Sequence, residues 1–227
     1  MTRKTNARIV GYAFIIYIAA GILSMVLAGR SRAGEGIAAK LASMSEHSTA
    51  TGLAVLLTFV MAFAAFWLGV SLYALTKDED PDLAMMGMIS RVAEGVVGIS
   101  LPSTVILFWL ATATGPMAPD TAGAQAIGAF LLRLETATSL IAATLFAVGS
   151  MLFCWLLLRG RMIPAPLAWL GLVGSVILVV ALPLQLAGFF SGMATQLMWI
   201  PVALFELAVA PWLIIKGAAA PVRRQPA

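Results

Sequence analysis

The chain has 227 residues, of which 61% are hydrophobic and only 11% are charged. An ordinary soluble domain has roughly 25% charged residues, so this composition excludes a soluble globular protein, and its hydrophobicity excludes a disordered chain. The net charge of +4 comes from 14 basic and 10 acidic residues, and the basic ones lie mostly at the ends of apolar segments. That distribution is typical of membrane orientation and does not indicate a nucleic-acid-binding surface.

Six apolar segments are long enough to cross a bilayer, whose ~30 Å core needs about 20 apolar residues per helix. We expect transmembrane helices at 9–28, 50–76, 83–112, 125–158, 166–187 and 197–215. The sequence therefore predicts an all-α polytopic bundle that forms a single integral membrane domain over 1–227. The first segment has a basic start like that of a signal peptide. Its apolar stretch is longer than the ~7–15 residues of a signal h-region, which favours a retained helix.

The connections between these segments carry turn and cap residues. Asp80-Pro81 is typical of a helix N-cap followed by a proline at the first helical position, and Gly115-Pro116 marks a turn. In the loop 31–48, Ile37, Leu41 and Met44 recur at helical spacing. This loop either forms a short interfacial helix on the outer surface or is irregular.

Lysine and arginine counts predict the orientation, because cytoplasmic loops carry an excess of both residues. An even number of spans puts both termini on one side. Nine basic residues fall on that side, against three on the other, which are Arg30, Arg32 and Lys40. We therefore expect both termini in the cytoplasm of a bacterial cell, with the bundle in its inner membrane.

Ionisable residues inside the apolar segments are the candidate functional residues, because a charge at the bilayer centre costs ~2.5–3.5 kcal/mol on insertion scales. Five residues qualify: Arg91, Glu94, Arg133, Glu135 and Glu206.

Glu206 lies in the middle of 197–215, which has no other charge, and Ala203 and Ala210 share its helix face. Small neighbours let another helix approach, so this face should point into the bundle. Glu206 either forms a structural ion pair or hydrogen bond, or it binds a proton, a cation or a ligand group. We expect it to meet an arginine or a neutral donor from another helix, and Arg91 is the better candidate.

Arg91 and Glu94 are three residues apart and can pair along one helix face, which continues through Gly95 and Gly98. That face is typical of a packed or pocket-lining surface. If the membrane core of this helix begins at Val92, however, Arg91 instead snorkels to the interface.

Arg133 and Glu135 are two residues apart, so they face opposite ways on a helix. Because 136–157 alone is long enough to span the membrane, both can lie at the outer interface. Glu135 shares a stripe with Thr138, Ser139 and Ala142 that looks inward-facing. Arg133 then points elsewhere, towards lipid headgroups or a neighbouring helix.

Cysteine and histidine are almost absent. Cys154 and His47 are single, which excludes an intramolecular disulfide, bis-histidine haem ligation and a two-histidine zinc site. No catalytic constellation is visible, so we expect neither an enzyme nor a bound cofactor or metal.

Several stretches together resemble a known family. They are 8–11 and 21–24 in the first helix, Arg91-Val92-Ala93-Glu94 in the third, 167–174 in the fifth, and Pro201-Val202-Ala203-Leu204-Phe205-Glu206-Leu207 with 212–217 in the sixth. They resemble the bacterial membrane family known as domain of unknown function 4386. The resemblance implies a six-helix inner-membrane protein and points to Arg91, Glu94 and Glu206. It implies no activity.

The expected function is binding of a small polar solute, ion or lipid headgroup by an inward-facing Arg/Glu cluster. Glu206 would accept a proton or cation, Arg91 would be its counter-charge or an anion contact, and Glu94 would orient Arg91. The alternative is a structural or assembly subunit whose buried charges fix helix packing. The expected partners are the lipid bilayer, a small polar ligand or ion, and a membrane subunit or a second copy of the chain, but not nucleic acid.

Overall fold

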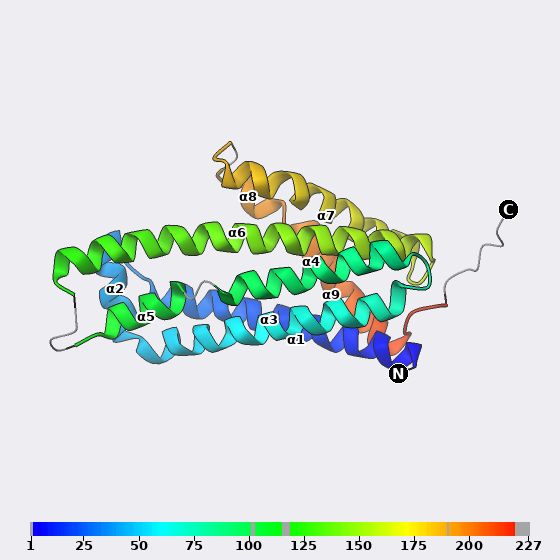
Figure 1. The fold of residues 1–227 in the computed structure, drawn as a ribbon, viewed down its shortest axis with the longest axis horizontal. Coiled ribbons are helices and arrows are strands. Elements are labelled where there is room, and N and C mark those ends of the chain that lie inside the picture. The colour runs from blue at the N-terminus through cyan, green and yellow to red at the C-terminus, as the bar shows by residue number, and fades with distance from the viewer. Residues whose placement is uncertain (1, 101–102, 115–118, 190, 221–227) are drawn as a thin grey trace.

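The computed structural model describes residues 2–100, 103–114, 119–189 and 191–220, and these residues form nine α-helices and no strand. The long helices run side by side along one axis, and the first and last described residues lie at the same end of the bundle (Figure 1). We call this the terminal end. The helices are α1 Arg3–Ser31, α2 Gly36–Glu46, α3 Ser48–Thr76, α4 Pro81–Ser100, α5 Ser103–Thr112, α6 Thr121–Arg159, α7 Ala165–Leu186, α8 Ala194–Leu197 and α9 Ile200–Ile215.

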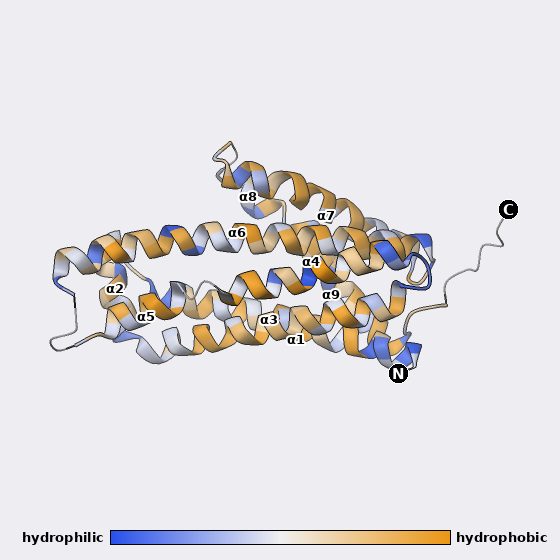
Figure 2. Ribbon diagram, viewed as in Figure 1, coloured by the Kyte–Doolittle hydropathy of each residue, from blue (hydrophilic) through white to orange (hydrophobic). Residues whose placement is uncertain are grey.

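Six stretches of the described chain are long and apolar enough to cross a membrane, which confirms the predicted all-α bundle of six spans. Four of them are α1, α3, α6 and α7. The third span, Pro81–Thr112, contains α4 and α5, and the sixth, Ala194–Ile215, contains α8 and α9. Hydrophobic residues cover the sides of the helices, and hydrophilic ones gather at the ends (Figure 2). The predicted turn at Gly115-Pro116 lies outside the described residues.

The six spans form a closed ring in chain order. Each one packs against the next, from α1 to α3, α4, α6, α7 and α9, and α9 packs back against α1. Short connections between antiparallel neighbours favour this order. The ring closes tightly at Gly11 of α1, where an added methyl group would lie 2.7 Å from the carbonyl oxygen of Ala210 in α9.

Helix caps explain where several helices begin. The Asp80 carboxylate accepts a hydrogen bond from Leu83 N–H at 3.1 Å, and Pro81 is the first residue of α4. Asp120 caps α6 in the same way, accepting from Gly123 N–H at 2.7 Å. Each carboxylate satisfies one of the free N–H groups of the first helical turn.

The end opposite the termini is capped by a short helix. Helix α2 occupies most of the predicted loop 31–48 and packs against α5 and α6. Its Met44 is buried with Leu107, Leu110 and Leu131, so its apolar stripe faces the protein. The 39 residues of α6 extend about 58 Å, well beyond a ~30 Å bilayer core. At least one end of α6 therefore extends past the bilayer core.

The apolar core is concentrated near the terminal end. The largest buried cluster draws residues from all six spans, including Phe14, Leu68, Phe153 and Leu213. Towards the opposite end, the buried clusters are smaller, and α7 slopes away from α6 (Figure 1). This change in packing leaves room inside the ring.

Candidate functional site

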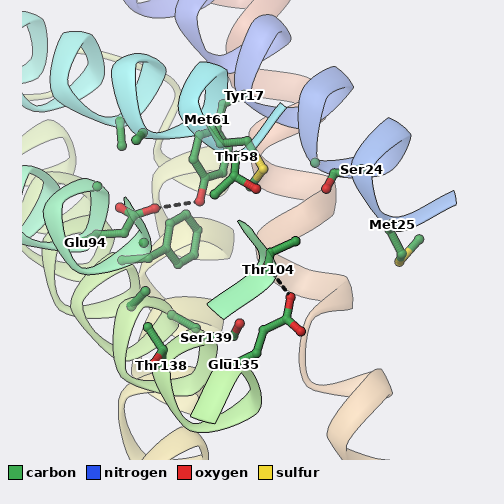
Figure 3. Close-up of a pocket in the computed structure, with 18 of the residues that line it drawn as sticks. Tyr17, Ser24, Met25, Thr58, Met61, Glu94, Thr104, Glu135, Thr138 and Ser139 are labelled. Carbon is green, nitrogen blue, oxygen red and sulfur yellow. Dashed lines mark hydrogen bonds between the residues drawn. The ribbon is translucent and has the colours of Figure 1, made fainter. Parts of the chain in front are cut away.

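A cavity of about 680 Å³ lies inside the ring, starting at mid-bundle and extending away from the terminal end. Every span except α7 contributes described residues to its wall. Most of the wall is apolar, and its ionisable groups include the carboxyl groups of Glu94, Glu135 and Glu206 and the phenol of Tyr17. Figure 3 shows Glu94 and Glu135 at different points around the cavity.

A buried ion pair lies at the mid-bundle end of the cavity, and its glutamate lines the wall. Arg91 and Glu94 lie one turn apart on α4 and are only 1% and 5% exposed. Arg91 Nη1 is 3.0 Å from Glu94 Oε2, and the Tyr17 hydroxyl of α1 donates a hydrogen bond to Glu94 Oε1 at 2.6 Å (Figure 3). Oε1 of Glu94 is therefore hydrogen-bonded, Oε2 is held by the charge of Arg91 without a hydrogen bond, and the charge of Glu94 is neutralised within its own helix. The sequence left open whether Arg91 snorkels to the interface, and the structure buries it inside the bundle.

Two aromatic rings complete the surroundings of Arg91. Its guanidinium carbon lies 5.2 Å from the centroid of Tyr17 and 4.8 Å from that of Phe146, and the two rings are nearly parallel. Such contacts stabilise a desolvated cation. Arg91 Nε, Nη1 and Nη2 are all buried without a hydrogen-bond partner among the described residues, so the charge of Glu94 and the ring faces take the place of acceptors.

Glycines make the room for this arginine. A methyl group added at Gly149 of α6 would lie 3.0 Å from Arg91 Cδ, and one added at Gly69 of α3 would lie 3.1 Å from Arg91 Cβ. Both helices can therefore approach α4 closely enough to seal the guanidinium from water and lipid. Arg91 is not among the described residues that line the cavity.

Glu206 is the carboxyl group that the bundle leaves unpaired. It is 7% exposed, lines the cavity from α9, and its Oε1 is buried with no hydrogen-bond partner among the described residues. Arg91 and Glu94 are near enough to act on it electrostatically, but no ion pair joins Glu206 to Arg91. The predicted contact between Glu206 and Arg91 is therefore wrong. Arg91 pairs instead with Glu94, which the helix already holds one turn away.

Glu135 lies at the other end of the cavity and is well satisfied. Arg32, which caps the end of α1, donates two parallel hydrogen bonds to it at 2.9 and 3.0 Å, and the Thr104 hydroxyl of α5 donates a third at 2.6 Å (Figure 3). This ion pair joins α1 to α6, which are not neighbours in the ring. Arg133, two residues from Glu135, is exposed on the outside of α6.

The sequence reasoning missed Tyr17, Phe146 and Arg32. Tyr17 carried a usable signal, because a phenol in the middle of an apolar span needs a hydrogen-bond partner. Arg32 was counted only as a loop charge that sets orientation, and its partner Glu135 is 103 residues away. Phe146 looks like any other apolar residue of its helix.

The carboxyl groups do not form a metal site. Among the described residues, no group of three or more histidine, cysteine, aspartate or glutamate side chains lies close enough together to hold a metal ion. Cys154 is buried in the apolar core.

Six apolar spans closed into a ring, with ionisable groups buried inside it, define a multi-pass helical membrane protein. A family model described as Domain of unknown function (DUF4386) matches residues 9–217. The chain belongs to this family, which confirms the resemblance seen in the sequence. No curated protein and no solved structure matches the chain.

Proposed function

We propose that this protein binds a small molecule inside the membrane, in the cavity of its helix ring, with Glu206 as the anchoring group. One observation carries the proposal: a cavity of about 680 Å³ has a buried carboxyl group on its wall that no described residue satisfies. Cavities of ~300–1,000 Å³ with apolar walls and few polar groups are the usual form of small-molecule sites. A carboxyl group that served only to hold helices together would have a partner.

The two other glutamates of the cavity have a structural role in this proposal. Glu94 neutralises Arg91 and accepts from Tyr17, and Glu135 is held by Arg32 and Thr104. A ligand at either residue would have to displace an existing ion pair. A ligand at Glu206 would displace nothing and would satisfy an oxygen that is otherwise unsatisfied.

The depth of the cavity supports access from the side opposite the termini. Glu206 lies nine residues from the end of α9, about 14 Å, whereas Glu135 lies about 36 Å from the terminal end of α6. The cavity thus runs from the bilayer centre to the far interface, where Met25 and Ser139 of its wall are exposed. With the termini in the cytoplasm, as the basic residues predict, this access faces the outside of the inner membrane.

Dicyclohexylcarbodiimide, an apolar reagent that modifies carboxyl groups, tests the proposal on wild-type protein in detergent micelles. Peptide mapping by mass spectrometry should find the adduct on Glu206, at a rate that saturates with reagent concentration because reversible binding precedes reaction. Glu94 should react much more slowly, because its Oε1 is hydrogen-bonded and its Oε2 is held by the charge of Arg91.

The matched controls are Glu206→Gln, which should remove the adduct, and Glu46→Gln, which changes an exposed glutamate of α2 and should leave it unchanged. Labelling of Glu206 only after the protein is unfolded would overturn the proposal. A partner that co-purified in fixed ratio and blocked the labelling would favour an assembly subunit instead.

A further inference from the structure

The charges around the cavity do not balance. Arg91 neutralises Glu94, and Arg32 neutralises Glu135, through ion pairs of 3.0 and 2.9 Å. Glu206 adds one carboxyl group, and the described residues of the cavity wall include no arginine, lysine or histidine that could balance it. When all these groups are ionised, the site has one negative charge without a counter-charge.

An ionised carboxylate buried in an apolar wall without a partner is strongly destabilised. Glu206 must therefore hold a proton or meet a cation that comes from outside the protein. A bare metal ion is poorly suited, because hard cations need about six oxygen ligands and, among the described residues, no three acidic, histidine or cysteine side chains lie close enough together to hold one. A cation that carries its own apolar groups suits both the charge and the wall.

An aromatic side chain for such a cation, Trp199, lies two helical turns from Glu206, about 10 Å along α9. Trp199, Ala203 and Glu206 project from the same face of α9 and its first turn, and all three line the cavity. The centroids of the Trp199 and Phe146 rings are 6.2 Å apart. The other neighbour of the Phe146 ring is the Arg91 guanidinium. Tryptophan is the best aromatic partner for an organic cation, especially in a dry site.

We propose that the ligand is a small organic cation with one positive charge, an ammonium group that bears apolar substituents. This inference rests on the proposed function and specifies its ligand class. The ammonium group contacts the Glu206 carboxylate and the Trp199 ring, and the substituents fill the apolar part of the cavity. Anions are excluded, because they would meet the unpaired Glu206 while both nearby arginines are already paired.

Two probes of nearly equal shape test the charge. Benzyltrimethylammonium carries a permanent positive charge, and neopentylbenzene is its neutral carbon analogue. In micelles with wild-type protein, benzyltrimethylammonium should slow carbodiimide labelling of Glu206 at a concentration at least about tenfold lower than neopentylbenzene, because the neutral analogue makes neither the ion pair with the carboxylate nor the cation–π contact. Benzenesulfonate, an anion of similar size, should not protect Glu206.

Thermal stabilisation by each probe gives a second readout that does not depend on labelling. Glu206→Gln should lose the preference for the cation while still binding the neutral analogue, and Glu46→Gln should behave like wild type. Because the wild-type comparison of the two probes needs no variant, a poorly folding Glu206→Gln would leave the test intact.

The outcomes separate the two proposals. Equal protection by the cation and its neutral analogue, or stronger protection by benzenesulfonate, would overturn the cation inference and leave a small-molecule cavity. Failure of the carbodiimide to reach Glu206 in folded protein would overturn the proposed function itself.

An organic cation could come from solution or from a lipid headgroup. Delipidated protein should be titrated with dioleoylphosphatidylethanolamine and, separately, with dioleoylphosphatidylglycerol. Protection of Glu206 by the amine lipid alone would support the inference and identify a headgroup as the source. Protection by benzyltrimethylammonium and by neither lipid would support it and identify a soluble amine. Protection by the anionic lipid alone would overturn it.

Discussion

The terminal end and the opposite end of the helix ring differ in how they fill space and how they treat buried charge. Near the termini, side chains from all six spans form one continuous apolar core, and Arg159 pairs with Glu79 and Asp80 at 3.0 and 3.3 Å. Further along the same ring, the core gives way to a cavity of about 680 Å³, and Glu206 has no hydrogen-bond or ion-pair partner among the residues that the structure describes.

Under the proposed function, this difference separates the part of the fold that provides stability from the part that binds a ligand. A packed core and paired charges hold the six spans together, and a hollow with an unsatisfied group leaves binding energy available for a ligand. The Arg91–Glu94 pair lies at the boundary, at the mid-bundle end of the cavity. Changes in the packed half should therefore reduce the free energy of unfolding, whereas changes at Glu206 should affect ligand binding.

The largest effect on stability is expected from Glu94→Gln. The glutamine can still accept from Tyr17, but it removes the ion-pair partner of the buried Arg91, which should lower the free energy of unfolding by about 3–5 kcal/mol. Chemical denaturation in mixed micelles measures this loss in the free energy of unfolding. The control is Arg91→Met combined with Glu94→Gln, which removes both charges and should recover most of the loss. If the double variant were no more stable than Glu94→Gln alone, Glu94 would not be the group that neutralises Arg91.

Gly11→Ala should have the next largest effect, because it acts on the closure of the ring. The new methyl group would meet Ala210 O at 2.7 Å and Ile214 Cγ1 at 2.6 Å, so α9 would have to move away from α1. We expect a loss of about 1–3 kcal/mol in the free energy of unfolding. Gly29→Ala in the same helix has nothing within 4 Å and should be neutral or gain up to about 1 kcal/mol. If Gly11→Ala and Gly29→Ala changed the free energy of unfolding equally, the close contact described between α1 and α9 would be contradicted.

A smaller effect is expected from Arg32→Gln at the outer end of the cavity. It removes the two parallel hydrogen bonds to Glu135 but leaves the one from Thr104, so we expect a loss of about 1–2 kcal/mol. The matched control is Arg133→Gln, which changes an exposed arginine of α6 and should alter stability by less than about 0.5 kcal/mol. Melting temperatures in one detergent compare the two, and a larger loss from Arg133→Gln would contradict the described ion pair.

The class of fold could be predicted from the sequence because the length and apolarity of a span are local properties. Closure of the ring by Gly11 against Ala210 could not, because it depends on contacts between the two ends of the chain. The spacing of Arg91 and Glu94 along one helix predicted that they can pair, and the structure confirms this ion pair, whereas the pairing of Glu135 with Arg32 was not predicted. Arg91 was the expected partner of Glu206 because a buried charge in a membrane requires an opposite charge. Arg91 instead pairs with Glu94, which lies one turn away on the same helix, α4. Arg32, in a loop, gave no sign that it reaches Glu135.

The free energy of unfolding of Glu206→Gln, measured beside that of Glu94→Gln under the same conditions, tests the central claim most directly. That claim is that Glu206 is kept for binding and is not needed for folding. It predicts that Glu206→Gln stays within about 1 kcal/mol of wild type or exceeds it, because the substitution removes an unpaired buried charge. A loss as large as that of Glu94→Gln would show that Glu206 holds the bundle together, and would contradict the claim.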